Sequence, residues 1–305
     1  MEMISHNITL FAEPIGNFHG LTITNALLTS WSAVLIIVIL SLVLRSKLRM
    51  IPNKLQNIFE ILVDGALDLC DQVTSDRALS LKVFPLAISV FFFVLINNWL
   101  GLLPLGGFGI LEKSNEGLSF VPFLRGGTAD VNTTIALAIM AVVGANLFGI
   151  FSIGIWKTFN KYVNLKALGE MFTKIRKEPT VIIVAPITFF VGIIEIIGEF
   201  AKIASLSFRL FGNVFAGEVL LASMAALIAY IVPIPFIFLE ILVGVIQALI
   251  FSMLLVVYFT ISATDHEEKE HEYEAVLEEE LKKSKPARPN GHSGGESIII
   301  NNSTA

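Results

Sequence analysis

Residues 195–220 read EIIGEFAKIASLSFRLFGNVFAGEVL and lie inside an apolar segment, residues 181–230, that is long enough to cross a membrane. An ionisable side chain at the bilayer centre costs roughly 3 kcal/mol, so such residues are retained where they face a partner, a cavity or an ion path. Because arginine stays protonated, Arg209 is the centre of this candidate site. The other polar residues of the stretch are Glu195, Glu199, Lys202, Asn213 and Glu218.

The whole chain is too apolar for an ordinary soluble domain. Its 305 residues are 54% hydrophobic and only 15% charged, which is typical of a protein with several membrane spans. The single cysteine, Cys70, rules out an internal disulfide framework. The net charge of −5 is modest and gives no indication of a nucleic-acid partner. We expect neither a metal site nor a cofactor.

Four other apolar runs are close to the ~20 residues that a membrane-spanning helix needs. Residues 57–73 instead alternate apolar residues at helical spacing with acidic residues on another face. This pattern predicts an amphipathic helix along the cytoplasmic membrane surface, and a soluble surface helix over a small loop domain is the alternative. Together with residues 181–230, the runs 26–44, 84–103, 131–156 and 236–261 predict an all-α polytopic membrane protein with about five crossings.

The charges of the loops predict the orientation of these spans. Loops 45–82 and 157–177 carry six Lys or Arg residues each, whereas loop 104–130 has only Lys113 and Arg125. Positive residues favour the cytoplasmic side, so we expect the N-terminus outside and the C-terminus inside. The predicted division is an external segment 1–26, a membrane domain 27–264 and an acidic, largely disordered cytoplasmic tail 265–305.

Helical geometry distributes the polar residues of the central segment over two faces. Glu195, Lys202 and Arg209 are seven residues apart and share one stripe, whereas Glu218 points to the opposite face. Fifty helical residues would be ~75 Å long, so the segment must tilt, kink or project from the membrane. Small residues of the same region would let another helix approach closely. They are Ala201, Ala204, Ser205, Gly212, Ala216 and Gly217.

The last span carries two polar residues, Glu240 and Gln247, which are seven apart and share a face. An antiparallel hairpin that turns near residue 232, at the two prolines there, would set Gln247 near Gly217 and Glu240 near Met224. A tilt of either helix would move Gln247 toward the arginine by a turn or more.

Several of these residues also fit purely structural roles. Glu195, Glu199 and Lys202 fit salt-bridged polar residues near a helix end, and Glu218 and Gln247 fit hydrogen bonds between helices. Arg209 is harder to explain in this way. No acidic residue lies four positions from it on either side, and it is too far from the end of its segment to snorkel.

The motif SFRLFGNVFAGEVLL at residues 207–221 resembles the signature of subunit a of F-type ATP synthase. The stretches NNWLGLLP (97–104), TADVNTTIALA (128–138) and IQALIFSMLLVVYF (246–259) resemble other parts of that family in the expected order. The resemblance implies that Arg209 is the essential stator arginine of the family. It implies that the polar path through two aqueous half-channels includes Glu195, Asn213, Glu218 and Gln247, with Asn98 and Glu240 as further positions.

The resemblance also implies a function and partners. The last two helices would form a long, tilted hairpin against a ring of small c-type subunits. They would carry protons to and from the ring carboxylates and so couple proton flow to ATP synthesis. Peripheral-stalk b-type subunits, a soluble ATPase head and membrane lipid would be further partners, and the chain would not be catalytic alone. Glu240 stands where some relatives have histidine, and nothing transfers to the acidic tail.

Other functions predict other sequence features. A sodium-translocating form of the same subunit would not differ here, because its ion ligands would lie on the ring. A secondary transporter predicts inverted repeats, which we do not find. An intramembrane enzyme needs a nucleophile with its base or paired aspartates, and the spans offer neither. The long charged tail favours a bacterial plasma membrane over an organellar one.

Overall fold

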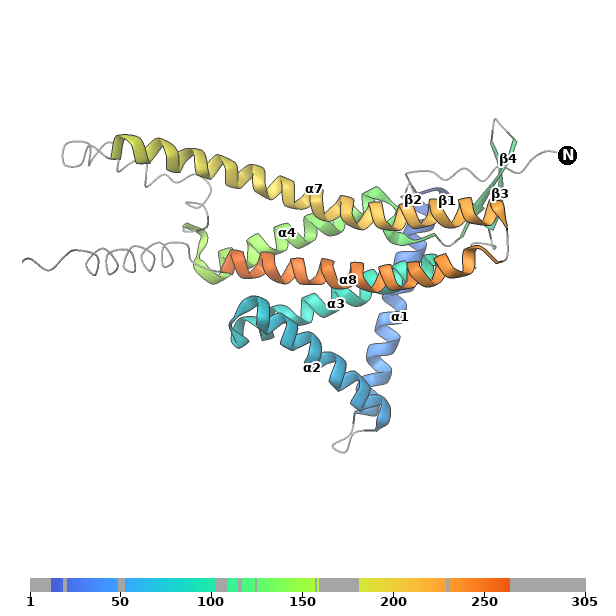
Figure 1. Cartoon of the computed structure of the whole chain (residues 1–305), viewed down its shortest axis with the longest axis horizontal. Coiled ribbons are helices and arrows are strands. Elements are labelled where there is room, and N and C mark those ends of the chain that lie inside the picture. The colour runs from blue at the N-terminus through green and yellow to red at the C-terminus, as the bar shows by residue number, and fades with distance from the viewer. Residues whose placement is uncertain are drawn as a thin grey trace, which may run out of the picture. The chain divides into compact units, whose positions relative to one another are not determined.

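The structure is a computed structural model of the chain in which helices dominate (Figure 1). It describes residues 12–18, 21–48, 53–102, 109–114, 117–123, 125–156, 158, 181–228 and 231–263. Five of its helices are long and apolar enough to cross a membrane, which confirms the predicted all-α polytopic class. They are α1 (Asn25–Lys47), α3 (Arg77–Leu102), α4 (Val131–Ile153), α7 (Val181–Leu227) and α8 (Pro233–Ala263).

The ends of these helices differ from the predicted ones where local chemistry decides them. Helix α3 begins at Arg77 rather than at residue 84, because the Asp76 carboxylate accepts a hydrogen bond from the Ala78 backbone N–H at 2.9 Å. Helix α4 ends at Ile153 rather than at residue 156, because Gly154 has a φ of 104°. Pro233 is the first residue of α8 instead of part of the turn, a position where its missing N–H leaves no bond unmade.

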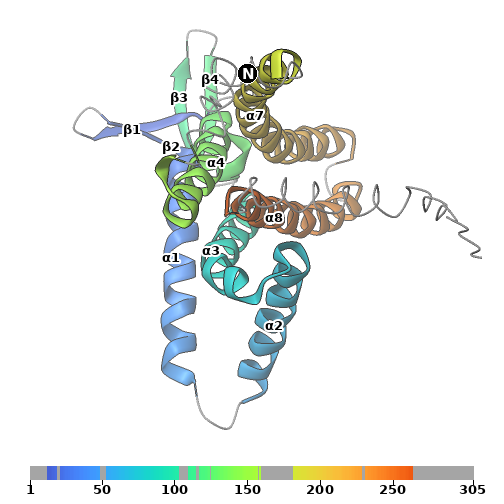
Figure 2. The same cartoon turned by 90° about the vertical axis from the view of Figure 1, so that its left-hand side faces the viewer.

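The amphipathic segment is a helix, α2 (Lys54–Thr74). Its apolar side packs on α3 and α8 and buries Leu67 and Cys70, while Asp64 and Asp68 are exposed. Figure 2 shows α2 beside α3 and well separated from most of α1. The alternation of apolar and acidic residues therefore indicates a helix that packs on one side. The position of this helix on the cytoplasmic membrane surface stays a prediction.

Two short β-hairpins, which the sequence did not predict, lie outside the spans. Strands β1 (Pro14–Phe18) and β2 (Leu21–Thr24) pair antiparallel just before α1. Strands β3 (Gly109–Ser114) and β4 (Gly117–Pro122) pair antiparallel in the loop between α3 and α4. With only four to six residues each, these strands are too short to give a clear period-two pattern.

The buried core lies between α3, α4, α8 and the middle of α7. Its largest fully buried apolar side chains include Phe251 and Leu255 from α8 and Leu206 and Leu210 from α7. Helix α7 is a single uninterrupted helix of 47 residues, and few of its described side chains are buried. At 1.5 Å per residue it is about 70 Å long, so only part of it can lie in the hydrocarbon layer.

Several predictions fall outside the described residues. They concern the second basic loop, apart from residue 158, and the acidic tail, residues 265–305. The division into residues 1–26, 27–264 and 265–305 therefore remains a prediction.

Candidate functional site

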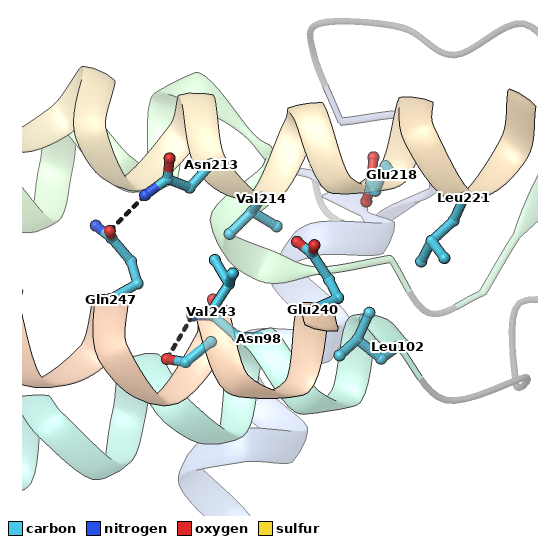
Figure 3. Close-up of a pocket in the computed structure, with 11 residues that line it drawn as sticks. Asn98, Leu102, Asn213, Val214, Glu218, Leu221, Glu240, Val243 and Gln247 are labelled. Carbon is cyan, nitrogen blue, oxygen red and sulfur yellow. Dashed lines mark hydrogen bonds between the residues drawn. The ribbon is translucent and has the colours of Figure 1, made fainter. Parts of the chain in front are cut away.

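A pocket with both polar and apolar side chains lies between α7 and α8, with the end of α3 below it (Figure 3). Its volume is about 430 Å³, including the space at its open side. Five of the residues predicted for the polar path meet in it although they come from three helices. The polar residues that line it are Asn98, Asn213, Glu218, Glu240 and Gln247.

One direct hydrogen bond ties the two long helices together at this pocket. The side-chain amide of Asn213 on α7 donates to Gln247 Oε1 on α8 at 2.6 Å. Gln247 is only 2% exposed, and its Nε2 has no partner among the described residues. A buried amide donor that faces a pocket without a protein partner is a natural position for a water molecule.

The register of the hairpin differs from the predicted one. Gln247 meets Asn213 rather than Gly217, which is a shift of one turn, and Glu240 meets Gly217 rather than Met224. The direction of the shift is the one expected from a helix tilt. The absence of a side chain at Gly217 accounts for this register, because the Glu240 side chain of α8 can lie directly against the backbone of α7 only at a glycine.

Glu240 points from α8 toward α7 in Figure 3 and lies in contact with Gly217. A Cβ at Gly217 would overlap the Glu240 carboxylate. Gly217 is buried and Glu240 is half-buried. In the part of the chain that the structure describes, the Glu240 carboxylate forms no hydrogen bond or ion pair.

We expect Gly217→Ala to leave the complex assembled but to lower ion transport several-fold. The added methyl group would displace the end of a flexible side chain rather than backbone, so the fold should tolerate it, whereas Glu240 must leave its position. The measurement is ATP-driven pumping in vesicles per assembled complex. Gly65→Ala on α2 is the control, because a Cβ there meets no other atom within 4 Å and the residue does not line the pocket. Wild-type pumping in Gly217→Ala would contradict a transport role for the position of Glu240.

Glu218 is paired with Arg125, a residue of the loop between β4 and α4. The guanidinium donates from Nε and from a terminal nitrogen to Glu218 Oε2 at 3.1 and 3.0 Å. The side chains are only 10% and 24% exposed, respectively. The two-point contact fixes the orientation of the carboxylate as well as its distance.

Asn98 is nearly fully buried and is held on both sides. Its Oδ1 accepts a hydrogen bond from the Thr128 hydroxyl at 2.6 Å, and its Nδ2 donates to the Gly244 carbonyl at 3.4 Å. These contacts join α3 to α8 and to the short 3₁₀ turn η2 (Gly127–Ala129). These two hydrogen bonds hold the Asn98 side chain in place where it lines the pocket.

Arg209 does not line the pocket, although it is four residues, one helical turn, before Asn213. It is half-buried, and its guanidinium donates to Ser205 Oγ at 3.4 Å. Among the described residues no carboxylate forms an ion pair with it. A permanent cation therefore stands beside the pocket without a charged partner from this part of the chain.

A second polar group lies on the other side of Arg209 along α7. Lys202 Nζ lies 2.8 Å from Glu199 Oε1, and the side chain of Asn146 on α4 donates to Glu199 Oε2 at 3.1 Å. The salt-bridged alternative therefore applies to Glu199 and Lys202. Glu195 is half-buried one turn earlier; at 1.5 Å per residue it is about 35 Å from Glu218 along the helix, so the two cannot share a pocket.

Sequence reasoning missed Arg125 and Thr128 as parts of the site. Arg125 was counted only as a loop charge, and Thr128 only as part of a motif. One signal was available, because an acid inside an apolar helix needs a partner and this loop supplies few cations. Within the described residues no group of three or more His, Cys, Asp or Glu side chains forms a candidate metal site.

These observations define a class, an α-helical multi-pass membrane protein with a polar pocket between two long helices and an arginine beside it. A family model described as ATP synthase A chain matches residues 27–260. The chain therefore belongs to the ATP synthase A chain family, and the resemblance inferred from its motifs is confirmed.

Named relatives match most of the chain. The ATP synthase subunit a of Syntrophobacter fumaroxidans is 33% identical over 238 residues, which make up 78% of this chain and 83% of the relative. That of Gloeobacter violaceus is 32% identical over 250 residues, 82% and 86% of the two chains. The chloroplastic subunit a of Stigeoclonium helveticum is 32% identical over 241 residues, 79% and 85% of the two chains.

Proposed function

We propose that this chain is the stator subunit that carries ions through the membrane part of an F-type ATP synthase. It forms two aqueous half-channels that lead to and from the carboxylates of a rotating ring, and so couples ion flow to ATP synthesis. The observation that carries this proposal is the position of Arg209 between two polar groups of α7, beside a face of this helix that is exposed in the described structure.

The exposed face of α7 supports a ring of small helical subunits as the partner. Its small residues follow one another at roughly helical spacing, and Arg209 borders them. Small residues let a neighbouring helix approach closely, which brings its carboxylate within reach of the guanidinium. The exposed small residues are Ala201, Ala204, Ser205, Gly212 and Ala216.

The pocket between α7 and α8 is the outer half-channel in this mechanism. A proton from outside passes the pocket residues and neutralises a ring carboxylate, which then turns into lipid. After the turn, the carboxylate meets Arg209, whose charge favours loss of the proton. The proton leaves on the inner side past Glu195. Arg209 also blocks direct passage between the half-channels, because a fixed cation repels a passing proton.

We propose further partners in the same assembly. The chain acts as an ion-carrying subunit and leaves ATP chemistry to a soluble head, to which b-type subunits of a peripheral stalk connect it. The excess of Lys and Arg in two loops supports an outside N-terminus and a cytoplasmic C-terminus. A bacterial plasma membrane is the proposed location.

The test is ATP-driven pumping by the whole complex in inverted vesicles, with and without sodium. Acidification that needs no sodium is the expected result. Acidification that appears only with sodium, or sodium uptake instead, would assign the sodium-translocating form. Absence of a soluble ATPase head from the purified complex would contradict the stator role and favour a secondary transporter.

A further inference from the structure

The loop that carries Arg125 is held tightly by the surrounding helices. The Arg125 backbone N–H donates to Thr29 Oγ1 of α1 at 3.3 Å. A Cβ at Gly101 of α3 would lie 2.7 Å from the Cα of Gly126, closer than real Cβ contacts. Two residues further, Thr128 is fully buried against Asn98. The Arg125 side chain therefore starts from a fixed backbone.

The side chain is fixed as well. It forms the two-point contact with Glu218 and is only 10% exposed, so little room remains for it to swing into solvent. A Cβ at the next residue, Gly126, would lie 3.7 Å from Glu218 Oε1, so the loop backbone also stands beside the carboxylate. A bidentate guanidinium is more directional than an ammonium group, which explains an arginine at this position.

Glu240, the other carboxylate of the pocket, is in a different situation. It lies against Gly217, the neighbour of Glu218, and has no hydrogen-bond or ion-pair partner in the described chain. Near Glu218, the described residues include Arg125 from the loop, Glu240 from α8 and the uncharged Asn98 from α3. One carboxylate is thus bound to a cation and the other is left able to exchange a proton.

We propose that Arg125 is a positioning residue of the outer half-channel. It holds Glu218 in a closed ion pair at the loop, and Glu240 is the carboxylate that takes up and delivers the proton. This assignment rests on the proposed function and deepens it. It gives Glu218 the role of neutralising Arg125, because a buried arginine without a carboxylate would repel protons from the neighbouring Glu240.

A positioning role predicts changes in the rate of ATP synthesis per assembled complex, whereas a purely structural salt bridge would change the amount of complex that assembles. Glu218→Gln removes the carboxylate charge that Arg125 binds and leaves the guanidinium charge beside the path, so ATP synthesis per assembled complex should fall sharply. Removing the cation too, in Arg125→Gln with Glu218→Gln, should restore synthesis by roughly tenfold over the single variant, within the range of coupling between contacting residues. Arg125→Lys keeps a cation and should exceed Arg125→Gln in rate.

The experiment measures ATP synthesis by the complete complex in energised inverted vesicles, normalised to assembled complex. Lys113→Gln removes the other Lys or Arg between α3 and α4 and serves as the control with wild-type rates. A double variant no faster than Glu218→Gln would overturn the proposal. If Arg125→Gln prevents assembly, Arg125→Lys paired with Glu218→Asp replaces it. That pair keeps both charges and should retain synthesis, and its loss would overturn the proposal.

Arg209→Ala in the same vesicles separates this proposal from the general one. If Arg209→Ala stops synthesis while the Arg125 variants give no recovery, only the role of Arg125 is wrong. If Arg209→Ala synthesises ATP normally, the stator function itself is wrong.

Discussion

Arg209→Ala is expected to abolish both ATP synthesis and ATP-driven pumping while the complex still assembles. Arg209 is half-buried at the edge of an exposed face, and its side chain forms one long hydrogen bond to Ser205, so little packing is lost. What is lost is the permanent charge that meets each ring carboxylate and separates the half-channels. The variant should therefore also conduct protons passively across the membrane.

Arg209→Lys tests whether charge alone is sufficient. Lysine keeps the positive charge but lacks the planar guanidinium group with its several N–H donors. It can also give up its proton where water is excluded. We expect synthesis to be blocked as well, with a smaller passive leak than in Arg209→Ala. Vesicles with each variant are energised and assayed for ATP synthesis and for passive proton conductance. Arg45→Ala, which removes an exposed cation at the end of α1, is the control that should behave as wild type.

Glu218→Leu should slow proton flux by about tenfold or more, the second-largest effect that we expect. The substitution leaves the guanidinium of Arg125, only 10% exposed, without its carboxylate. Truncating one partner of a fully buried ion pair costs about 3–5 kcal/mol. We expect a smaller cost here, because the Glu218 side chain is 24% exposed and solvent screens the pair. The Arg125 charge, no longer balanced by Glu218, would also stand beside the path to Glu240.

Glu218→Asp separates the charge of Glu218 from its reach. Aspartate keeps the carboxylate on a side chain that is one methylene shorter, so part of the flux should remain. Flux is read as the rate of pH change in vesicles after energisation, per assembled complex. Asp68→Leu on α2, where the aspartate is exposed and outside the pocket, should not change it. Equal flux in wild type and Glu218→Leu would reduce Glu218 to a structural residue.

Much of the fold was predictable from local sequence alone. Runs of about 20 apolar residues identified the five spans, since no other common structure buries the backbone of such a run in lipid. Asp130 directly precedes α4 and caps it, because its carboxylate accepts a hydrogen bond from the Thr133 N–H at 3.3 Å. The candidate residues were found because ionisable groups are rare inside such spans. The 15-residue motif around Arg209 was specific enough to identify the family.

The pairing of the site residues was decided by the tertiary structure. Helical periodicity indicates which face a side chain occupies, but not which residue of another helix it meets. That depends on where the connecting segment ends and how closely the helices approach. Gly217 lets Glu240 lie against α7, and the resulting register brings Asn213 to Gln247.

Arg125 illustrates the same limit for a residue outside the spans. By sequence it is one of two cations in a loop, 93 residues from the acid that it binds. Only the folded chain, in which the loop packs between α1 and α3, carries its guanidinium to Glu218. The sequence by itself determined the spans, the polar positions and the family, because these depend on single segments and their solvent. The partners of each polar group were decided by packing between segments that are distant in sequence.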